Sequence, residues 1–325
     1  MNDLRSVVRL LSRQQWTTEK KIRDTLSYSD IGLKDAIDIL LLRGLHVESH
    51  PKYGFRLRKD VTLIDEQKLK KLLGEAELVC AKRLSVLDAV DSTNDLLLSW
   101  GDITTLHGRV FIAEFQDKGR GRDGRLWQAA GYQNLTLSLA WATHLSGIKL
   151  PAFSLVAALA LCICLDNMGY EKIGLKWPND VMLPSGKLAG ILVETNRRLS
   201  SNVFIVVGVG LNVRMSTSIN HVAKQPVCDL ESVSSSTVAI DRTLLAANLI
   251  ASMSEAFDQM ERLGFRSFME NWNDRDIFRD REVVGTNGDQ RIIGCGMGVD
   301  QYGAYLVRDE LGRVHKLVSG EARLR

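Results

Sequence analysis

The stretch from Gln116 to Trp127 has a composition that is unusual for a folded chain and well suited to binding an anion. Three glycines and four cations fall between Lys118 and Arg125. Glycine allows positive φ and close approach of the backbone to a ligand, and planar guanidinium groups bind phosphate through paired hydrogen bonds. The apolar, β-prone run at 109–115 predicts a strand before it. We therefore expect a strand that leads into a mobile loop closing on an anion, with a solvated basic turn as the alternative.

Two common nucleotide motifs do not account for this loop. The pattern Gly119-x-Gly121-x-x-Gly124 fits the dinucleotide fingerprint, which also needs a helix that begins in the loop and an acidic residue about 20 positions later. No Asp or Glu lies between Arg125 and Leu165, and the sequence after the loop predicts a turn and a strand. The P-loop pattern fails because no Lys-Ser or Lys-Thr follows a suitable glycine. The loop therefore belongs neither to a Rossmann fold nor to a P-loop enzyme.

A second group of charged residues lies in an otherwise apolar pair of predicted strands. A tight turn separates the two stretches, 175–183 and 187–194. Pro178 has no N–H to donate, so the first strand must bulge there or lie at a sheet edge. The charged residues are Lys176, Asp180 and Lys187. Two cations and a carboxylate near a Gly/Arg loop suit a polyanion such as ATP.

Two further segments could place polar groups or backbone beside a ligand. Ser92-Thr93-Asn94 precedes an apolar run with helical spacing, so a plain helix cap is the alternative to a ligand contact. A strand at 203–207 leads into Gly208-Val209-Gly210-Leu211-Asn212, where glycines again permit close approach. Between these segments, 152–168 predicts a buried helix.

Composition places the chain among ordinary globular proteins with more than one domain. Its 325 residues predict two or three domains, and 45% hydrophobic and 25% charged residues are typical values. The longest apolar run, at 152–165, is too short to cross a bilayer. Five cysteines without C-x-x-C spacing favour reduced thiols and a cytoplasmic location. The six histidines are scattered, so we expect no protein-held metal site, and the net charge of +3 decides nothing about nucleic acid.

Residues 1–60 have the pattern of a winged helix-turn-helix. Three segments with helical spacing precede two short β-prone stretches. The cations that could contact DNA are Lys34 in the third helix and Lys52 and Arg56 in the hairpin. The third helix also carries Asp30, Asp35 and Asp38, which oppose a phosphate-lined groove. The alternative is a unit kept for packing or protein contact, and 61–75 reads as a helical or extended connector.

The fold class that we expect is a multidomain α+β protein. A mixed α/β catalytic domain occupies 76–275, after the winged helix and the connector. Short strands alternate with turns over 276–325 and predict a small β-barrel.

Five motifs occur together in one order that resembles a known family. They are Ser-Thr-Asn at 92–94, Gln-x-x-Gly-Arg-Gly-Arg-x-Gly-Arg-x-Trp at 116–127, Lys-Trp-Pro-Asn-Asp at 176–180, Lys-Leu-Ala-Gly-Ile-Leu-Val-Glu at 187–194 and Gly-x-Gly-x-Asn at 208–212. The sequence resembles the biotin protein ligases, specifically the bacterial bifunctional type that is also the biotin operon repressor. The resemblance covers nearly the whole chain and implies that the C-terminal barrel is SH3-like.

The resemblance also implies roles for individual residues. The positions that it assigns to biotin are Ser92, Thr93, Asn94, Gln116, Arg120, Gly121, Arg122 and Lys187. Those that it assigns to ATP or the adenylate are Gly119, Arg122, Trp127, Asn179, Asp180, Asn212 and Arg325. The residues that it implies for catalysis are Lys187, Arg120, Lys176 and Asp180. Asp123 departs from the pattern, because close relatives often have a cation there, and a solvated terminal arginine is the alternative for Arg325.

The resemblance implies a ligase that joins biotin to ATP as biotinyl-5′-AMP and then to a lysine of the biotin carboxyl carrier protein of acetyl-CoA carboxylase. Mg²⁺ would accompany ATP. A second role as a biotin-responsive repressor implies operator DNA and a homodimer when the adenylate is bound. The competing interpretations are a lipoate-type ligase with the same catalytic core, and a DNA-binding biotin sensor without catalysis. No membrane partner is expected.

Overall fold

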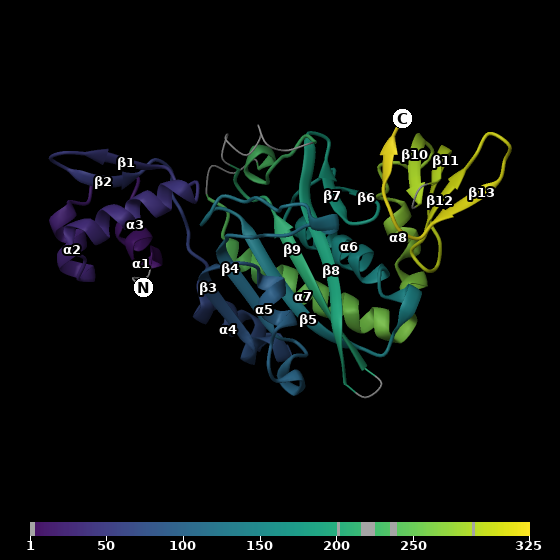
Figure 1. Ribbon diagram of the computed structural model, residues 1–325, viewed down its shortest axis with the longest axis horizontal. Coiled ribbons are helices and arrows are strands. Elements are labelled where there is room, and N and C mark those ends of the chain that lie inside the picture. The colour runs from purple at the N-terminus through teal and green to yellow at the C-terminus, as the bar shows by residue number, and fades with distance from the viewer. Residues whose placement is uncertain (1–3, 200–201, 216–224, 235–238, 288–289) are drawn as a thin grey trace.

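The computed structural model describes residues 4–199, 202–215, 225–234, 239–287 and 290–325. Three units follow one another along the long axis of the molecule (Figure 1). A helical unit with a small hairpin comes first, a large sheet covered by helices lies in the middle, and a second sheet ends the chain. The mixed α/β character that the sequence predicts is confirmed.

The N-terminal unit packs three helices beneath a two-stranded sheet. The elements are α1 (Leu4–Leu10), α2 (Glu19–Leu26), α3 (Asp30–Leu42), β1 (Val47–His50) and β2 (Gly54–Leu57). Thr18 and Ser29 cap α2 and α3, since their hydroxyls accept from the backbone N–H of Lys21 and Gly32. Strands β1 and β2 are antiparallel. Apolar side chains of all three helices form one separate core.

One residue of the central unit completes that N-terminal core. Tyr132 is 1% exposed, lies among the apolar side chains of the N-terminal unit and has a positive φ of 62°. Its hydroxyl donates to Asp88 Oδ1 at 2.7 Å, and Arg43 Nη1 lies 3.2 Å from Asp88 Oδ2. The N–H of Gly131 donates to the carbonyl of Arg43. The two units are therefore joined by buried contacts as well as by the chain.

The central sheet has seven strands in the order β3-β4-β5-β9-β8-β7-β6. Their bounds are β3 (Leu84–Val90), β4 (Val110–Gln116), β5 (Leu135–Thr143), β6 (Gly174–Lys176), β7 (Asp180–Leu183), β8 (Gly186–Leu199) and β9 (Asn202–Leu211). Only β3 and β4 pair in parallel. The strands expected before and after the Gly/Arg loop are confirmed as β4 and β5.

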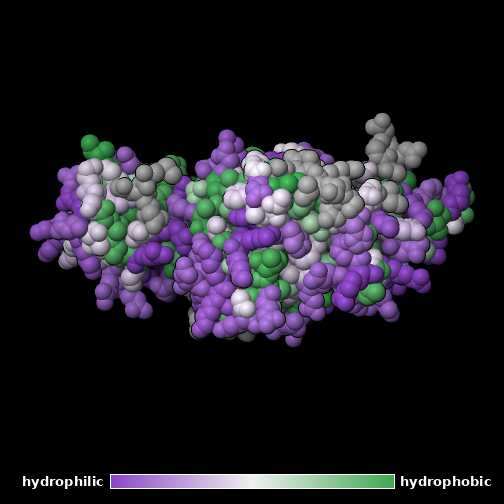
Figure 2. All heavy atoms as spheres, turned by 90° about the horizontal axis from the view of Figure 1, so that it is seen from below, coloured by the Kyte–Doolittle hydropathy of each residue, from purple (hydrophilic) through white to green (hydrophobic). Residues whose placement is uncertain are grey.

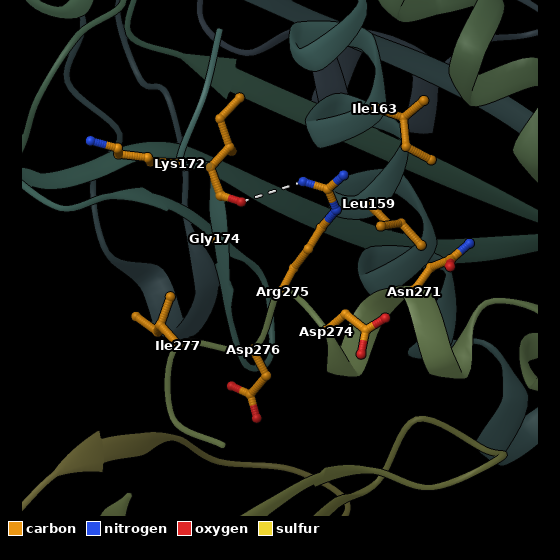
Figure 3. Close-up of a pocket in the computed structure, with 10 residues that line it drawn as sticks. Leu159, Ile163, Lys172, Gly174, Asn271, Asp274, Arg275, Asp276 and Ile277 are labelled. Carbon is orange, nitrogen blue, oxygen red and sulfur yellow. Dashed lines mark hydrogen bonds between the residues drawn. The ribbon is translucent and has the colours of Figure 1, made fainter. Parts of the chain in front are cut away.

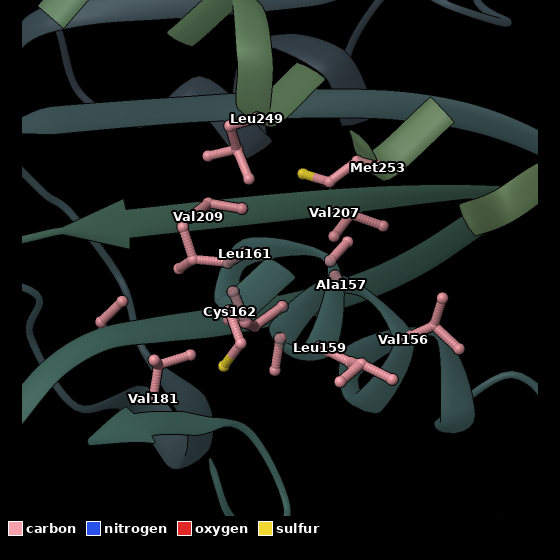
Figure 4. Packing of buried hydrophobic residues seen from close by; sticks show 14 of the residues in the cluster. Val156, Ala157, Leu159, Leu161, Cys162, Val181, Val207, Val209, Leu249 and Met253 are labelled. Carbon is pink, nitrogen blue, oxygen red and sulfur yellow. The ribbon is translucent and has the colours of Figure 1, made fainter. Parts of the chain in front are cut away.

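Helices cover the two faces of this sheet unequally. The helices α4 (Glu66–Glu75), α6 (Ala152–Asn167) and α7 (Arg242–Leu263) share the main apolar core. Figure 4 shows Val209 of β9 with Leu249 of α7 on one side of it and Leu161 of α6 on the other. The short helix α5 (Thr93–Leu98) covers the other face over a smaller core. The buried helix expected at 152–168 is confirmed, and the expected connector is helical from Glu66 on.

The interruption at Pro178 differs from the expectation. The sequence predicts one irregular strand over 175–183, but the chain reverses there, and β6 and β7 pair with each other. Lys176 and Asp180 are partners in that hairpin. Since proline cannot donate to a ladder, the strand ends before it and the turn begins. The reversal leaves β6 at the sheet edge, as a proline nearby requires.

The C-terminal unit is a five-stranded antiparallel sheet in the order β13-β12-β11-β10-β14. The strands are β10 (Glu282–Asn287), β11 (Gln290–Val299), β12 (Tyr305–Arg308), β13 (Val314–Leu317) and β14 (Ala322–Leu324), and α8 (Met269–Asn273) precedes them. Its apolar residues, among them Val299 and Tyr305, join the core of the central unit. The sheet is therefore packed against the catalytic unit.

The surface is largely hydrophilic on the face seen from below (Figure 2). Apolar residues reach that face only in separate small areas. Among the helices of the described residues, none combines the length and apolar character that a membrane crossing needs. All five cysteines are free thiols, and four of them are buried.

Candidate active site

The Gly/Arg loop forms a small internally bonded turn between β4 and β5. The N–H of Gly121 donates to the carbonyl of Arg125 at 2.7 Å, and the N–H of Trp127 donates to the carbonyl of Gly119 at 2.8 Å. Asp123, at the tip, has a φ of 55°, which Asp tolerates better than most residues. The loop therefore has a defined backbone path, although its tip is exposed.

A neutral polar network lies at one end of the loop, where α5 meets the sheet. Thr93 donates from both its N–H and its hydroxyl to Gln116 Oε1, at 2.8 and 3.0 Å. The Thr93 hydroxyl also lies 2.7 Å from Ser138 Oγ, and Ser138 Oγ lies 2.5 Å from Asn94 Oδ1. Ser92 caps α5, so its hydroxyl has a structural use as well. The structure thus brings together the four residues that the resemblance assigns to biotin at this end, and adds Ser138.

Arg120 is held by two carboxylates that border the network. Its Nη1 lies 3.0 Å from Glu194 Oε1, and it also pairs with Asp95. Asn94 Nδ2 donates to the other oxygen of Glu194 at 2.8 Å. Burial of the guanidinium opposes its charge, but the carboxylates of Glu194 and Asp95 outweigh burial and raise the pKa of Arg120. Glu194 therefore connects the loop to the neutral network.

The charged residues of the two predicted strands form a cluster on β6, β7 and β8. Lys187 Nζ lies 2.6 Å from Asp180 Oδ1, and Lys176 Nζ lies 3.9 Å from Asp180 Oδ2. The side chains of Lys176, Asp180 and Lys187 are only 20%, 12% and 18% exposed. Two cations around one carboxylate leave one positive charge in a largely buried place. Such an arrangement attracts an anion that can share the lysines with Asp180.

Trp127 lies between the neutral network and the charged cluster. Lys187 Nζ is 5.6 Å from the centre of its ring. A Cβ atom on Gly210 would lie 2.2 Å from the indole, and one on Gly190 would lie 3.2 Å from it. The close approach expected at the Gly-x-Gly segment of β9 is thus made by a protein side chain. A Cβ on Gly208 would lie 2.4 Å from Asn94 Oδ1 for the same reason.

Two asparagines expected at the nucleotide hold backbone in this structure. Asn179 Nδ2 donates to the carbonyl of Ile191 at 2.7 Å. Asn212 is 4% exposed, and its Nδ2 donates to the carbonyl of Cys228 at 3.1 Å. Both side chains therefore fix the segments that carry the cluster.

The C-terminal unit reaches the Gly/Arg loop through residues 320–321. Arg122 Nη1 donates to the carbonyl of Gly320 at 3.2 Å, and Arg125 pairs with Glu321. Arg325 lies elsewhere, on the exposed side of β14, where it pairs with Glu282 at 2.6 Å. The structure therefore does not bring Arg325 to the cluster.

Several residues of the site escaped sequence reasoning. Asp95 directly follows the motif at 92–94 and Glu194 ends the motif at 187–194, so these motifs were the available signal. Gly190 lies inside the motif at 187–194, whereas Ser138 lies in an apolar strand and gave no signal of its own. Glu321 contacts the loop from almost 200 positions away. Among the described residues no group of three or more His, Cys, Asp or Glu could hold a metal ion.

The cations expected at DNA lie on the N-terminal unit. Lys34 and Lys52 are exposed, and Lys52 lies 5.6 Å from the ring of Tyr53. Arg56 is half-buried, pairs with Glu48 at 2.6 Å and stacks over Trp16 at 4.5 Å. The outer face of α3 also shows exposed Ile31 and Leu42.

Comparison with known proteins agrees with the motifs. The profile of the biotin/lipoate A/B protein ligase family matches residues 86–212. The chain is 31% identical over 320 residues to the bifunctional ligase/repressor BirA of Escherichia coli (strain K12), across 98% of this chain and 96% of that protein. It is 29% identical to the biotin–[acetyl-CoA-carboxylase] ligase of Mycobacterium tuberculosis, across 74% of this chain and 88% of that protein.

A solved structure gives the same result. The biotin protein ligase of Aquifex aeolicus in complex with biotin and ATP aligns with a TM-score of 0.64 and 27% identity. The alignment covers 75% of this chain and 99% of that one. The ordered motifs, the sheet that carries them and similarity over nearly the whole length together show that this chain is a ligase of the biotin protein ligase family.

Proposed function

We propose that the protein is an ATP-dependent biotin–protein ligase. The carboxylate of biotin attacks the α-phosphorus of ATP, which releases pyrophosphate and forms biotinyl-5′-AMP. A lysine amine of the acceptor then attacks the acyl carbon, and AMP leaves. The observation that carries the proposal is the Lys176–Asp180–Lys187 cluster beside Trp127, with a neutral polar network on the other side of the ring.

The charged cluster supplies what the first step needs. Two anions must approach each other, and negative charge builds up around phosphorus. Lys187 and Lys176 offset that charge, and they are already oriented because Asp180 holds both. When phosphate oxygens arrive, they can share these cations with Asp180. No side-chain nucleophile is required, since biotin itself attacks.

The neutral network suits the uncharged ring system of biotin. Ser92, Thr93, Asn94 and Gln116 offer donors and acceptors from a rigid helix start and a strand end. The backbone at Gly119 and Gly121 and the guanidiniums of Arg120 and Arg122 would close over the ligand from the loop. A closed loop excludes water, which would hydrolyse the mixed anhydride.

The nucleotide would lie on the cluster side of Trp127, whose ring we assign to adenine. Asn179 and Asn212 would act there by fixing backbone as well as by contact. Arg325 would need a new partner, because it pairs with Glu282. Mg²⁺ would be bound mainly by the phosphates, since Asp180, the carboxylate of the cluster, is already neutralised by lysine.

The acceptor and a second role follow from the relatives. We propose that the acceptor is the biotin carboxyl carrier protein of acetyl-CoA carboxylase, which places the reaction in the cytoplasm. We propose that the N-terminal unit is a winged helix-turn-helix and the C-terminal sheet an SH3-like barrel, supported by three helices before a two-stranded sheet and by five antiparallel strands. A biotin-responsive repressor would use Lys34, Lys52 and Arg56 at operator DNA, as a homodimer with the adenylate bound.

The test is pyrophosphate release from ATP and Mg²⁺ with biotin or with lipoate. We expect release with biotin alone and a retained biotinyl-5′-AMP. Release with lipoate but not biotin would identify a lipoate-type ligase. Tight binding of biotin without pyrophosphate would identify a sensor without catalysis. A gel shift on the promoter of biotin genes, with and without the adenylate, tests the repressor role separately.

A further inference from the structure

We propose that Trp177, Asp276 and Tyr305 are positioning residues for the ATP-dependent step. Their contacts attach strand β6 to the C-terminal sheet and so hold Lys176 and Asp180 opposite Lys187. We call these contacts of Trp177, Asp276 and Tyr305 the clamp. The proposal rests on the proposed function of that cluster. None of the three positioning residues contacts the cluster through its own side chain in this structure.

Strand β6 needs support from outside the central sheet. It has three residues and lies at the sheet edge, with β7 as its one neighbour among the named strands. So short an edge strand is marginal by itself. The support comes from the segment after α8. The N–H of Leu175 donates to the carbonyl of Arg275 at 2.7 Å, and the N–H of Ile277 donates to the carbonyl of Leu175 at 3.0 Å.

Trp177 fastens the turn that follows β6. Its side chain is 3% exposed, and its indole N–H donates to the carbonyl of Gly303 at 3.1 Å. The ring centre lies 5.9 Å from that of Tyr305 on β12. Because Trp177 is directly bonded to Lys176, the indole limits how far that lysine can move.

Asp276 connects the segment that pairs with β6 to strand β12 of the C-terminal sheet. The Tyr305 hydroxyl donates to Asp276 Oδ2 at 2.9 Å, and the N–H of Phe278 donates to Asp276 Oδ1 at 3.0 Å. Asp276 is 9% exposed, and burial raises its pKa to about 6. The same residue bridges to Leu175 through the backbone. The two neighbours of Asp276 in the chain hydrogen-bond to Leu175 of β6, and the Asp276 carboxylate accepts from Tyr305 of β12.

Figure 3 shows the same joint from the side of α6. A groove of about 660 Å³ is lined by residues of α6, by 172–174 and by the segment around Arg275. The Arg275 guanidinium donates to the carbonyl of Ile173, just before β6, and pairs with Asp166 of α6, while Asp276 points the other way, toward the C-terminal strands. The two sides of the joint are therefore held by adjacent residues with opposite directions.

The geometry predicts an effect on chemistry that is separate from biotin binding. Asp180 meets Lys187 at 2.6 Å only if the β6–β7 hairpin keeps its place against β8. The neutral network uses α5, β4 and β5 and does not involve the hairpin. Loosening the clamp should therefore lower turnover with ATP and leave biotin affinity unchanged.

The experiment compares Trp177→Phe with Trp272→Phe in the full-length protein. Both tryptophans are buried, but the Trp272 indole N–H has no hydrogen-bond partner among the described residues. Trp177→Phe loses a hydrogen bond and Trp272→Phe does not. We expect Trp177→Phe to lower kcat for pyrophosphate release roughly 5–10-fold. Biotin affinity should stay within about twofold of wild type, and Trp272→Phe should retain kcat within about twofold.

Tyr305→Phe tests the other half of the clamp, with Tyr302→Phe as an exposed control on the preceding turn. Tyr305→Phe removes a donor from a buried carboxylate, so kcat should fall about as much as in Trp177→Phe. The double variant Tyr305→Phe/Asp276→Asn also lacks the carboxylate charge, so it should recover at least half of the loss in log kcat that Tyr305→Phe causes. Tm measurements on every variant confirm that each is folded.

Amide hydrogen exchange over residues 172–184 gives a readout that does not depend on turnover. Exchange there should be faster in Trp177→Phe than in Trp272→Phe, with or without ligand. Equal exchange in the two variants, or equal kcat, would overturn the proposal. Wild-type protein that makes no pyrophosphate would instead overturn the proposed function, while exchange still decides whether the clamp exists.

Discussion

The two sides of Trp127 differ in how they satisfy buried polar groups. On the α5 side, Thr93, Gln116, Ser138 and Asn94 are neutral and bond mainly to one another. On the β6–β8 side, two lysines flank one carboxylate, so the net charge of the cluster is positive. The first arrangement has few spare donors or acceptors, and the second has spare charge.

The difference shows how each half can be selective. A buried polar group without a partner costs free energy, so a neutral network favours a ligand that replaces its internal bonds one for one. A buried unpaired lysine would cost more, which is why Asp180 is needed before the anion arrives. We therefore expect shape and hydrogen-bond pairing to select a ligand on the neutral side, and charge to select it on the charged side.

Lys187→Ala should have the largest effect. Alanine removes the cation closest to Asp180, and loss of one such charged contact lowers kcat by about 10²–10³-fold. The measurement is pyrophosphate release at saturating biotin and ATP. Lys172→Ala, an exposed lysine before β6, is the control. Near-normal turnover would remove Lys187 from the reaction.

Gly210→Ala tests the boundary between the two sides. The new methyl group would lie 2.2 Å from the Trp127 indole, so the ring must move. Forcing extra volume into such a contact costs about 1–3 kcal/mol of unfolding free energy. Thermal unfolding and tryptophan fluorescence report the change. Gly74→Ala in α4, where no atom lies within 4 Å, should be neutral or stabilising.

Thr93→Val tests the neutral side alone. Valine keeps the shape but removes the hydroxyl shared by Gln116 and Ser138. Biotin affinity, measured by calorimetry, should fall about tenfold. Turnover at saturating biotin should stay near that of wild type, as should both quantities in the exposed control Thr104→Val. A fall in kcat with unchanged affinity would show that the two sides are not separate.

Glu194→Gln should have the smallest effect, because it changes only the link between the network and the loop. The amide can still bond Asn94 but no longer neutralises Arg120. Partly exposed ion pairs contribute up to about 1 kcal/mol, so trypsin should cleave after Arg120 up to about fivefold faster. Unchanged cleavage would mean that Asp95 alone holds the loop.

Elements with a strong periodic signal could be predicted from the sequence. The run at 109–115, the buried helix at 152–168 and the cap at Ser92 all appear as expected. The path at Pro178 could not be predicted, because a bulge and a reversal satisfy proline equally well. In the structure the chain reverses, and Lys176 and Asp180 become partners in the hairpin.

Individual residues of the site were less predictable than the motifs that contain them. Glu194 bonds Asn94 and Arg120 across 100 and 74 positions, and no local pattern carries such a pairing. For Arg325 the resemblance implied the nucleotide, and in the structure its side chain pairs with Glu282. A motif identifies a segment, and packing decides which of its side chains faces the ligand.

The position of Tyr132 limits how this protein can be rearranged by engineering or by recombination. A catalytic fragment that lacks the N-terminal unit would expose this aromatic ring and leave Asp88 without Arg43. The N–H of Gly131 would also lose its acceptor. The N-terminal unit is therefore not an interchangeable module. Any replacement for the N-terminal unit would have to provide an apolar pocket for the Tyr132 ring and a cation to pair with Asp88.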